Sequence, residues 1–144
     1  MSRVMRSLRM MQNMERFATR IYQTQTRAFT DKESMDKLRA AIANEQEHAD
    51  SLDACLERLG GRTSPLGFLF PIAGSLVGFI TTLMGKALLF KAAVWIEERA
   101  VKDYVLYLER VKFDGETVNL LQRIIEDEKR HIATWQICLE ALKG

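Results

Sequence analysis

The sequence contains only two histidines, and each one ends a Glu-x-x-His pattern. The first pattern runs from Glu45 to His48, and the second runs from Glu128 to His131. Residues three apart in a helix point to the same side, so the glutamate and the histidine of one pattern can bind one metal ion together. Mixed carboxylate and imidazole ligation suits iron or manganese, and zinc also accepts it. The chemistry to expect from these residues is that of a transition-metal centre.

Each Glu-x-x-His pattern is preceded by a glutamate that has a tyrosine seven residues after it, namely Glu15 with Tyr22 and Glu97 with Tyr104. The spacing between the two glutamates is 30 residues in the first half and 31 in the second. A four-helix bundle can hold two metal ions with one carboxylate from each of two helices and a Glu-x-x-His from each of the other two. The expected metal ligands are therefore Glu15, Glu45, His48, Glu97, Glu128 and His131.

The charges of such a site have to balance inside an apolar core. An unpaired buried carboxylate costs several kcal/mol, whereas a whole domain is stable by only about 5–15 kcal/mol. Two divalent cations carry four positive charges, which balance the four glutamates, and each neutral histidine adds one nitrogen. Glu45 and Glu128 could bridge both ions. We expect two iron ions, with manganese or zinc able to substitute.

Further polar residues near the patterns allow two interpretations. Tyr22 and Tyr104 are either packed aromatic residues or hydrogen-bond donors to a ligating carboxylate, and the sequence leaves both open. Asp50 and Asp127 could each orient an imidazole ring, but a solvated helix face explains them as well, and we favour the solvated face.

Four stretches of helical periodicity position these residues, and every expected ligand falls on the apolar stripe of its stretch. The fold class is therefore all-α, a four-helix bundle formed by one domain over residues 1–144. The helices are expected from Arg3 to Phe29, from an N-cap at Ser34 to a stop at Gly60-Gly61, from about Lys86 to about Asp114-Gly115, and from about Glu116 to the end.

A hydrophobic crossover of about residues 63–88 joins the second and third helices. No charged residue occurs in the 23 positions from Thr63 to Gly85, but two prolines and four glycines interrupt them. The length alone would reach across a bilayer, which needs about 20 residues. Because the prolines and glycines break the run, we expect instead a flap over the site, a contact with the membrane interface, or a homodimer contact.

The overall composition excludes some classes of function. A net charge of +2 is too small to indicate a nucleic-acid-binding surface. The first 30 residues nevertheless contain six arginines and only one acidic residue, Glu15. That arginine-rich and methionine-rich start lies either on anionic lipid or, through its methionines, inside the bundle. Cys55 and Cys138 form no zinc or Cys-x-x-Cys spacing and are expected to be core side chains rather than redox partners. We expect a cytoplasmic protein, peripheral on the inner face of the membrane.

With these glutamate, tyrosine and Glu-x-x-His patterns, the sequence resembles the ferritin-like di-iron carboxylate proteins and, among them, the demethoxyubiquinone hydroxylase family of ubiquinone biosynthesis. The resemblance covers roughly Met14 to Trp135. That family continues beyond its last ligand helix, whereas this sequence ends 13 residues after His131. The segments that carry the resemblance are Glu15 to Gln25 with Arg20-Ile21-Tyr22, Gly85-Lys86 through Val94 and Glu97-Glu98 to Tyr104, and Asp127-Glu128 with His131.

The resemblance implies iron at the six residues named above, with Tyr104 beside the site. It also implies a monooxygenase that uses O₂ to hydroxylate a quinone-like hydrophobic substrate, with the crossover touching membrane and quinone. Two other hypotheses remain: a ferroxidase or rubrerythrin-like peroxidase that handles Fe(II) or peroxide, and a non-catalytic metal-stabilised interaction module. Since no rubredoxin-like cysteine pairs are present, either redox enzyme needs an external electron donor.

Overall fold

The computed structural model describes residues 2–144, which are mostly helical and contain no strand within that range. A 3₁₀ turn over Thr26–Ala28 separates the first two α-helices. The α-helices are α1 (Arg3–Gln25), α2 (Lys32–Arg58), α3 (Leu69–Leu83), α4 (Lys86–Arg110) and α5 (Gly115–Ala141).

Aspartate caps begin the two helices that carry the Glu-x-x-His patterns. The side chain of Asp31 accepts a hydrogen bond of 2.9 Å from the backbone N–H of Ser34. The prediction of Ser34 as the N-cap of α2 was therefore wrong, because Ser34 is the residue being capped. Asp114 does the same for α5 and accepts from the backbone N–H of Thr117 at 3.1 Å. Each cap satisfies a backbone donor that the first helical turn leaves without a partner.

The helix ends differ slightly from the expected ones. The α-helical part of α1 stops at Gln25 rather than Phe29, because the chain tightens into the 3₁₀ turn. The end of α2 before Gly60 was predicted correctly, and Gly60 has a φ of +75°, which favours glycine. Helix α4 ends at Arg110, a few residues earlier than expected.

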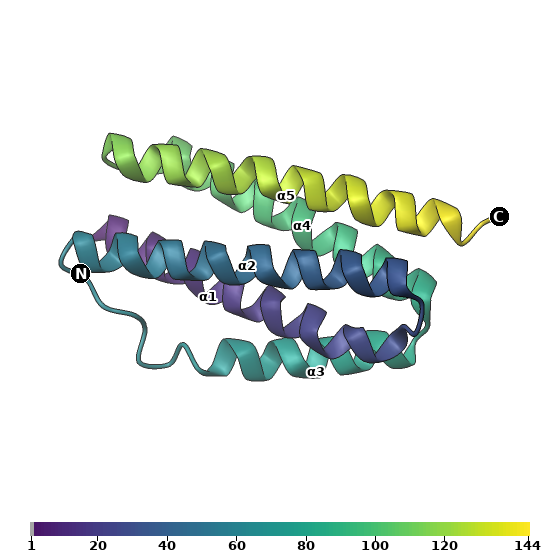
Figure 1. Cartoon of the computed structure of the whole chain (residues 1–144). Helices are drawn as coiled ribbons and strands as arrows, with labels where there is room; N and C mark the ends of the chain where they lie inside the picture. The colour runs from purple at the N-terminus through teal and green to yellow at the C-terminus, as the bar shows by residue number, and fades with distance from the viewer. Residues whose placement is uncertain (1) are drawn as a thin grey trace.

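Two helical hairpins, α1–α2 and α4–α5, face each other and form the four-helix bundle (Figure 1). Figure 1 shows α3 outside this bundle, running alongside α1. The predicted all-α, ferritin-like bundle with a crossover between its second and third helices is confirmed.

The crossover is not a broken connection, because residues 69–83 form helix α3. Pro71 sits in the first turn, where no backbone donor is lost. Gly74 and Gly78 face α1 so closely that a Cβ on Gly78 would lie 2.7 Å from the carbonyl oxygen of Ile21. Gly74 and Gly78, which were expected to break a helix, therefore allow α3 and α1 to approach each other closely. No helix within residues 2–144 is long and apolar enough to cross a membrane.

Two apolar clusters fill the bundle, one at each side of the expected ligands. The first contains Tyr22, Phe90 and Trp135, and the second contains Leu8, Leu56 and Leu121. Cys55 and Cys138 are buried free thiols in these clusters, as expected. The ligand layer thus lies between two apolar clusters along the bundle.

Candidate metal centre

The six residues expected to bind metal come together in the middle of the bundle. They form two groups of four, and within each group the candidate ligand atoms all lie within 4.8 Å of one another. Glu45 and Glu128 belong to both groups, which is the arrangement required of carboxylates that bridge two ions. One group is Glu15, Glu45, His48 and Glu128, and the other is Glu45, Glu97, Glu128 and His131.

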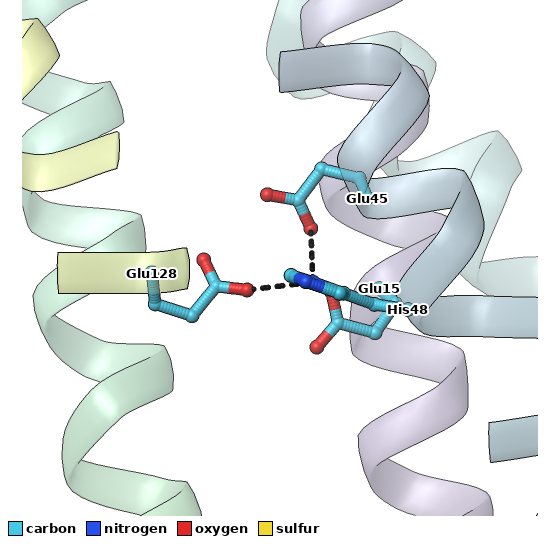
Figure 2. Close-up of side chains that lie close together, drawn as sticks. All are labelled: Glu15, Glu45, His48 and Glu128. Carbon is cyan, nitrogen blue, oxygen red and sulfur yellow. Dashed lines mark ion pairs between the residues drawn. The ribbon is translucent and has the colours of Figure 1, made fainter. Parts of the chain in front are cut away.

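In the first group, the ring of His48 lies among three carboxylates (Figure 2). Its Nδ1 atom is 3.0 Å from Oε1 of Glu128, 3.5 Å from Oε2 of Glu15 and 4.0 Å from Oε2 of Glu45. Figure 2 shows Glu128 reaching towards this ring from the opposite hairpin. All four side chains are nearly inaccessible to solvent.

The second group repeats this arrangement around His131. Its Nδ1 atom is 3.0 Å from Oε1 of Glu45, and it is 3.4 Å from both Oε1 of Glu97 and Oε2 of Glu128. The centroids of the two imidazole rings are 6.4 Å apart. The two groups therefore lie side by side and share the two central glutamates.

Several of these buried atoms have no hydrogen-bond partner, although polar groups in protein interiors are almost always paired. They are both carboxylate oxygens of Glu45, both of Glu128, and the Nδ1 atoms of the two histidines. These six atoms point at one another and leave their lone pairs unused. A pair of cations would satisfy all of them, so the residues present fit a dinuclear metal centre.

Protons balance the charge in the protein without metal. Burial, followed by the charge of Glu128, raises the pKa of Glu45 well above its usual range. Burial, with the charges of Glu97 and Glu15, raises the pKa of Glu128 to about 8. Burial alone would lower the pKa of His48, but the carboxylates beside it outweigh burial and raise its pKa to about 11. Metal binding therefore has to displace protons.

The two tyrosines donate hydrogen bonds to carboxylates of the centre, each across the bundle. The hydroxyl of Tyr22 on α1 donates to Oε1 of Glu97 on α4, and the hydroxyl of Tyr104 on α4 donates to Oε1 of Glu15 on α1. Burial, together with these carboxylates, raises the pKa of both tyrosines, which keeps them protonated as donors. The interpretation as donors to the expected ligands, left open by the sequence, thus agrees with the geometry.

Trp135 also takes part in this layer, a role that was not predicted from the sequence. Its indole N–H donates to the hydroxyl oxygen of Tyr22 at 3.2 Å. The spacing offers a signal in retrospect, because Trp135 follows His131 by one helical turn on the same face.

Asp127 does not simply face solvent, so the interpretation favoured from the sequence was wrong for it. The Nε2 atom of His48 lies 2.9 Å from Oδ2 of Asp127, and Arg130 binds the other carboxylate oxygen. Such a contact fixes the ring so that Nδ1 faces the glutamates. Asp50 is different, because it is exposed and accepts a hydrogen bond from Gln46, which is exposed as well.

A largely apolar cavity of about 380 Å³ opens on the metal centre between α1 and α4. The carboxylates of Glu15, Glu45, Glu97 and Glu128 form part of its wall. No residue of α3 lines it, so this cavity gives no support to the first of the three alternatives for the crossover, a flap over the site. The other lining residues include Met10, Met11, Met14, Phe17, Ala18, Trp95, Ile96, Ala100, Tyr104 and Tyr107.

The fold and the site together define a ferritin-like protein with a carboxylate-rich centre suited to two metal ions. The sequence model of one protein family, described as "Ubiquinone biosynthesis protein COQ7", matches residues 2–141, and the chain belongs to that family. The family is that of the demethoxyubiquinone hydroxylase, a di-iron oxidoreductase, which confirms the resemblance. No curated protein gives a significant match to the chain.

Proposed function

We propose that this chain hydroxylates the ring of a quinone-like substrate with O₂ at a pair of iron ions. One observation carries the proposal: an apolar cavity of about 380 Å³ ends on the four glutamates. A cavity of this size and lining suits a planar hydrophobic molecule with few polar groups. Oxidising Fe(II) or consuming peroxide would require only a path for a small species.

The six clustered residues would hold the metal in unequal roles. Glu15 and His48 would bind one ion and Glu97 and His131 the other, while Glu45 and Glu128, which belong to both groups, would bridge. Two ferrous ions would supply two electrons to O₂ at the end of the cavity. We assign the metal as iron from the family, and manganese or zinc would fill the same ligands.

The reaction needs more than O₂. One oxygen atom replaces a ring hydrogen and becomes the new hydroxyl, and the other leaves as water with two protons and two electrons from an external donor. The residues around the centre support this by excluding bulk water and by holding their protons. Tyr22 and Tyr104 remain neutral donors to Glu97 and Glu15 because their pKa values are raised, mainly by burial.

The external face of α3 is the part of the chain we propose to contact a membrane from the cytoplasmic side. One side of α3 packs on α1 through its glycines, and the other exposes large apolar side chains. The backbone of Phe17, whose side chain lines the cavity, lies against Gly74, so α3 and the cavity share α1 as a common wall. The exposed side chains of α3 are Leu69, Ile72, Leu76, Phe79, Ile80 and Leu83.

Membrane contact has a direct test. Anionic vesicles should sediment the protein, and Leu76→Ser with Phe79→Ser should abolish this, because both exposed side chains would lose their apolar contact with lipid. The matched control is Ile137→Ser, which changes an equally exposed apolar residue on α5. Sedimentation unchanged by the α3 variant would contradict the assignment.

The test of the enzymatic proposal begins with anaerobic loading of Fe(II) at two equivalents per chain. O₂ labelled with ¹⁸O is then admitted with and without a short-chain quinone that lacks one ring hydroxyl and with a chemical reductant. We expect a product that carries one labelled oxygen atom. Fast oxidation of the metal at a rate that does not depend on quinone would indicate a ferroxidase. Consumption of peroxide without quinone would indicate a peroxidase. Metal that O₂ does not oxidise would indicate a non-catalytic module.

A further inference from the structure

Three methionines of α1 line the cavity beside the metal centre: Met10, Met11 and Met14. Met11 is buried, whereas Met10 and Met14 are 43% and 36% exposed. Met11 precedes Glu15 by four residues, so it lies one turn away on the same face of α1. This places three thioether groups along the space that leads to Glu15.

Thioethers are the side chains of this wall that most readily accept an oxygen atom from peroxide; the wall also contains Trp95, Tyr104 and Tyr107, whose rings react with peroxide more slowly. A methionine sulfur accepts one oxygen atom and becomes a sulfoxide, which is polar and can be reduced again by dedicated enzymes. Leucine would fill the same volume without this reactivity. Three sulfurs in one wall of a redox cavity are therefore a chemical feature as well as a packing feature.

We propose that Met10, Met11 and Met14 are sacrificial oxidation sites that consume peroxide formed in the cavity when no organic substrate occupies it. The proposal rests on the proposed O₂-dependent function. When bound, a reduced metal pair would supply the two electrons that, with two protons, convert O₂ to hydrogen peroxide. The peroxide then transfers one oxygen atom to a thioether sulfur, which loses two electrons, and the O–O bond breaks to release water with both protons.

Confinement decides which methionines react. One molecule in a cavity of 380 Å³ corresponds to a concentration of about 4 M, far above any concentration that leaked peroxide reaches in bulk solution. Met84 provides the contrast, because it is 59% exposed and does not line the cavity. Oxidation by bulk peroxide should follow exposure and favour Met84, whereas oxidation from inside should favour Met11 and Met14.

Oxidation would also change the cavity itself. A sulfoxide at Met11 or Met14 puts a strong dipole into an apolar wall, and an apolar substrate would then bind less well. Oxidation of these methionines would thus first consume peroxide that could otherwise attack the metal ligands. The sulfoxides formed would then lower further turnover.

The test is peptide mass spectrometry of methionine sulfoxide in protein loaded with two Fe(II) per chain and exposed to O₂ without quinone. A parallel sample of metal-free protein receives hydrogen peroxide, and a zinc-loaded sample exposed to O₂ is the redox-silent control. In the iron sample we expect a severalfold excess of sulfoxide at Met11 and Met14 over Met84. In the peroxide sample Met84 should react first and buried Met11 last. Catalase should protect Met84 but not the cavity methionines, and a quinone analogue should protect the cavity methionines.

Sulfoxide that follows exposure in the iron sample, or equal protection of all methionines by catalase, would overturn the proposal. The two hypotheses can fail separately. A hydroxylated quinone together with exposure-ordered sulfoxide would refute the sacrificial role alone. Cavity-selective sulfoxide without any hydroxylated product would refute quinone hydroxylation and support the sacrificial role.

Discussion

The hairpin α1–α2 and the hairpin α4–α5 carry the same candidate ligands at matching positions, but the residues that support those ligands differ. Asn44 precedes Glu45 in the first hairpin, where Asp127 precedes Glu128 in the second. Asp127 binds the ring of His48 directly. Asn44 instead donates a long hydrogen bond of 3.4 Å to Oδ2 of Asp127, and within residues 2–144 no hydrogen bond joins it to His131. The first histidine is therefore held more firmly than the second.

The aromatic support is unequal as well. Tyr22 both donates to Glu97 and accepts from Trp135, while the hydroxyl of Tyr104 bonds to Glu15 alone among the described residues 2–144. The residue of α2 that corresponds to Trp135 is Leu52, which has no polar atom to offer. A repeated ligand pattern thus coexists with unrepeated supports, and the two metal positions should differ in affinity even though their ligands are the same.

The largest effect should come from the two shared glutamates. We expect Glu128→Ala to remove both metal ions, because Glu128 belongs to both groups, whereas His131→Ala should remove one. Metal analysis of the purified variants measures this, and Glu98→Ala, an exposed neighbour of Glu97, is the control that should keep two ions. Two ions retained in Glu128→Ala would show that Glu128 is not a ligand shared by the two metal positions.

Proton binding should give the metal-free and metal-loaded proteins opposite responses to pH. The pKa of Glu128 rises from 4.5 to about 8 on folding, and those of His48 and His131 rise from 6.5 to about 11 and about 9. The folded protein without metal then binds more protons than the unfolded chain, so its stability falls as the pH rises above about 4.5 for Glu128 and above about 6.5 for the histidines.

Metal binding requires those protons to leave, so the stabilisation that zinc gives should grow with pH. Denaturant unfolding between about pH 5 and about pH 8, with and without zinc, measures both trends. Parallel pH curves for the two forms would show that metal does not replace protons at these residues.

The unequal histidine supports predict unequal loss of affinity. Asp127→Ala should weaken metal binding at the His48 position by about 10–100-fold, because the ring loses the contact that orients it. Asn44→Ala should have a much smaller effect, because Asn44 touches no imidazole among the described residues and gives Asp127 only a hydrogen bond of 3.4 Å. Calorimetric titration with zinc resolves the two positions. Equal losses in both variants would show that the direct contact of Asp127 with His48 does not set the affinity at that position.

The smallest expected effect is a difference in the free energy of unfolding between Tyr22→Phe and Tyr104→Phe. Tyr22→Phe leaves a carboxylate oxygen of Glu97 and the indole N–H of Trp135 unpaired, whereas Tyr104→Phe leaves only an oxygen of Glu15. Each buried group without a partner costs about 1–3 kcal/mol. We expect Tyr22→Phe to lower the free energy of unfolding of the zinc-loaded protein by about 1 kcal/mol more than Tyr104→Phe. A reversed order in urea unfolding would show that Trp135 finds another partner.

Much of the candidate site could be predicted from the sequence because its signals are local. Glu45 with His48 and Glu128 with His131 satisfy a spacing that any helix converts into one shared direction. Glu15 and Glu97 stand out because each interrupts an apolar stripe. The supports were missed because they depend on the neighbouring helix. Asp127 lies on a partly exposed face of its own helix, and only the approach of α2 brings His48 to it.

Helix α3 shows the same limit for the fold. Pro71, Gly74 and Gly78 favour an interrupted chain when local propensity is the only guide. In the structure Gly74 and Gly78 gain from contact with the backbone of α1, which residues with a Cβ could not approach. Packing between distant segments thus outweighed local preference in this segment.

The sequence by itself determined the four bundle helices, the six candidate ligands and their number of charges, since these follow from spacing within one helix and from composition. Only the tertiary structure decided which tyrosine meets which carboxylate, which aspartate contacts an imidazole, and where the apolar cavity reaches the site. The physical reason is that hydrogen bonds and cavities between helices depend on how the helices are rotated and offset against one another. That arrangement is set by the packing of the whole core, which no single stretch of sequence contains.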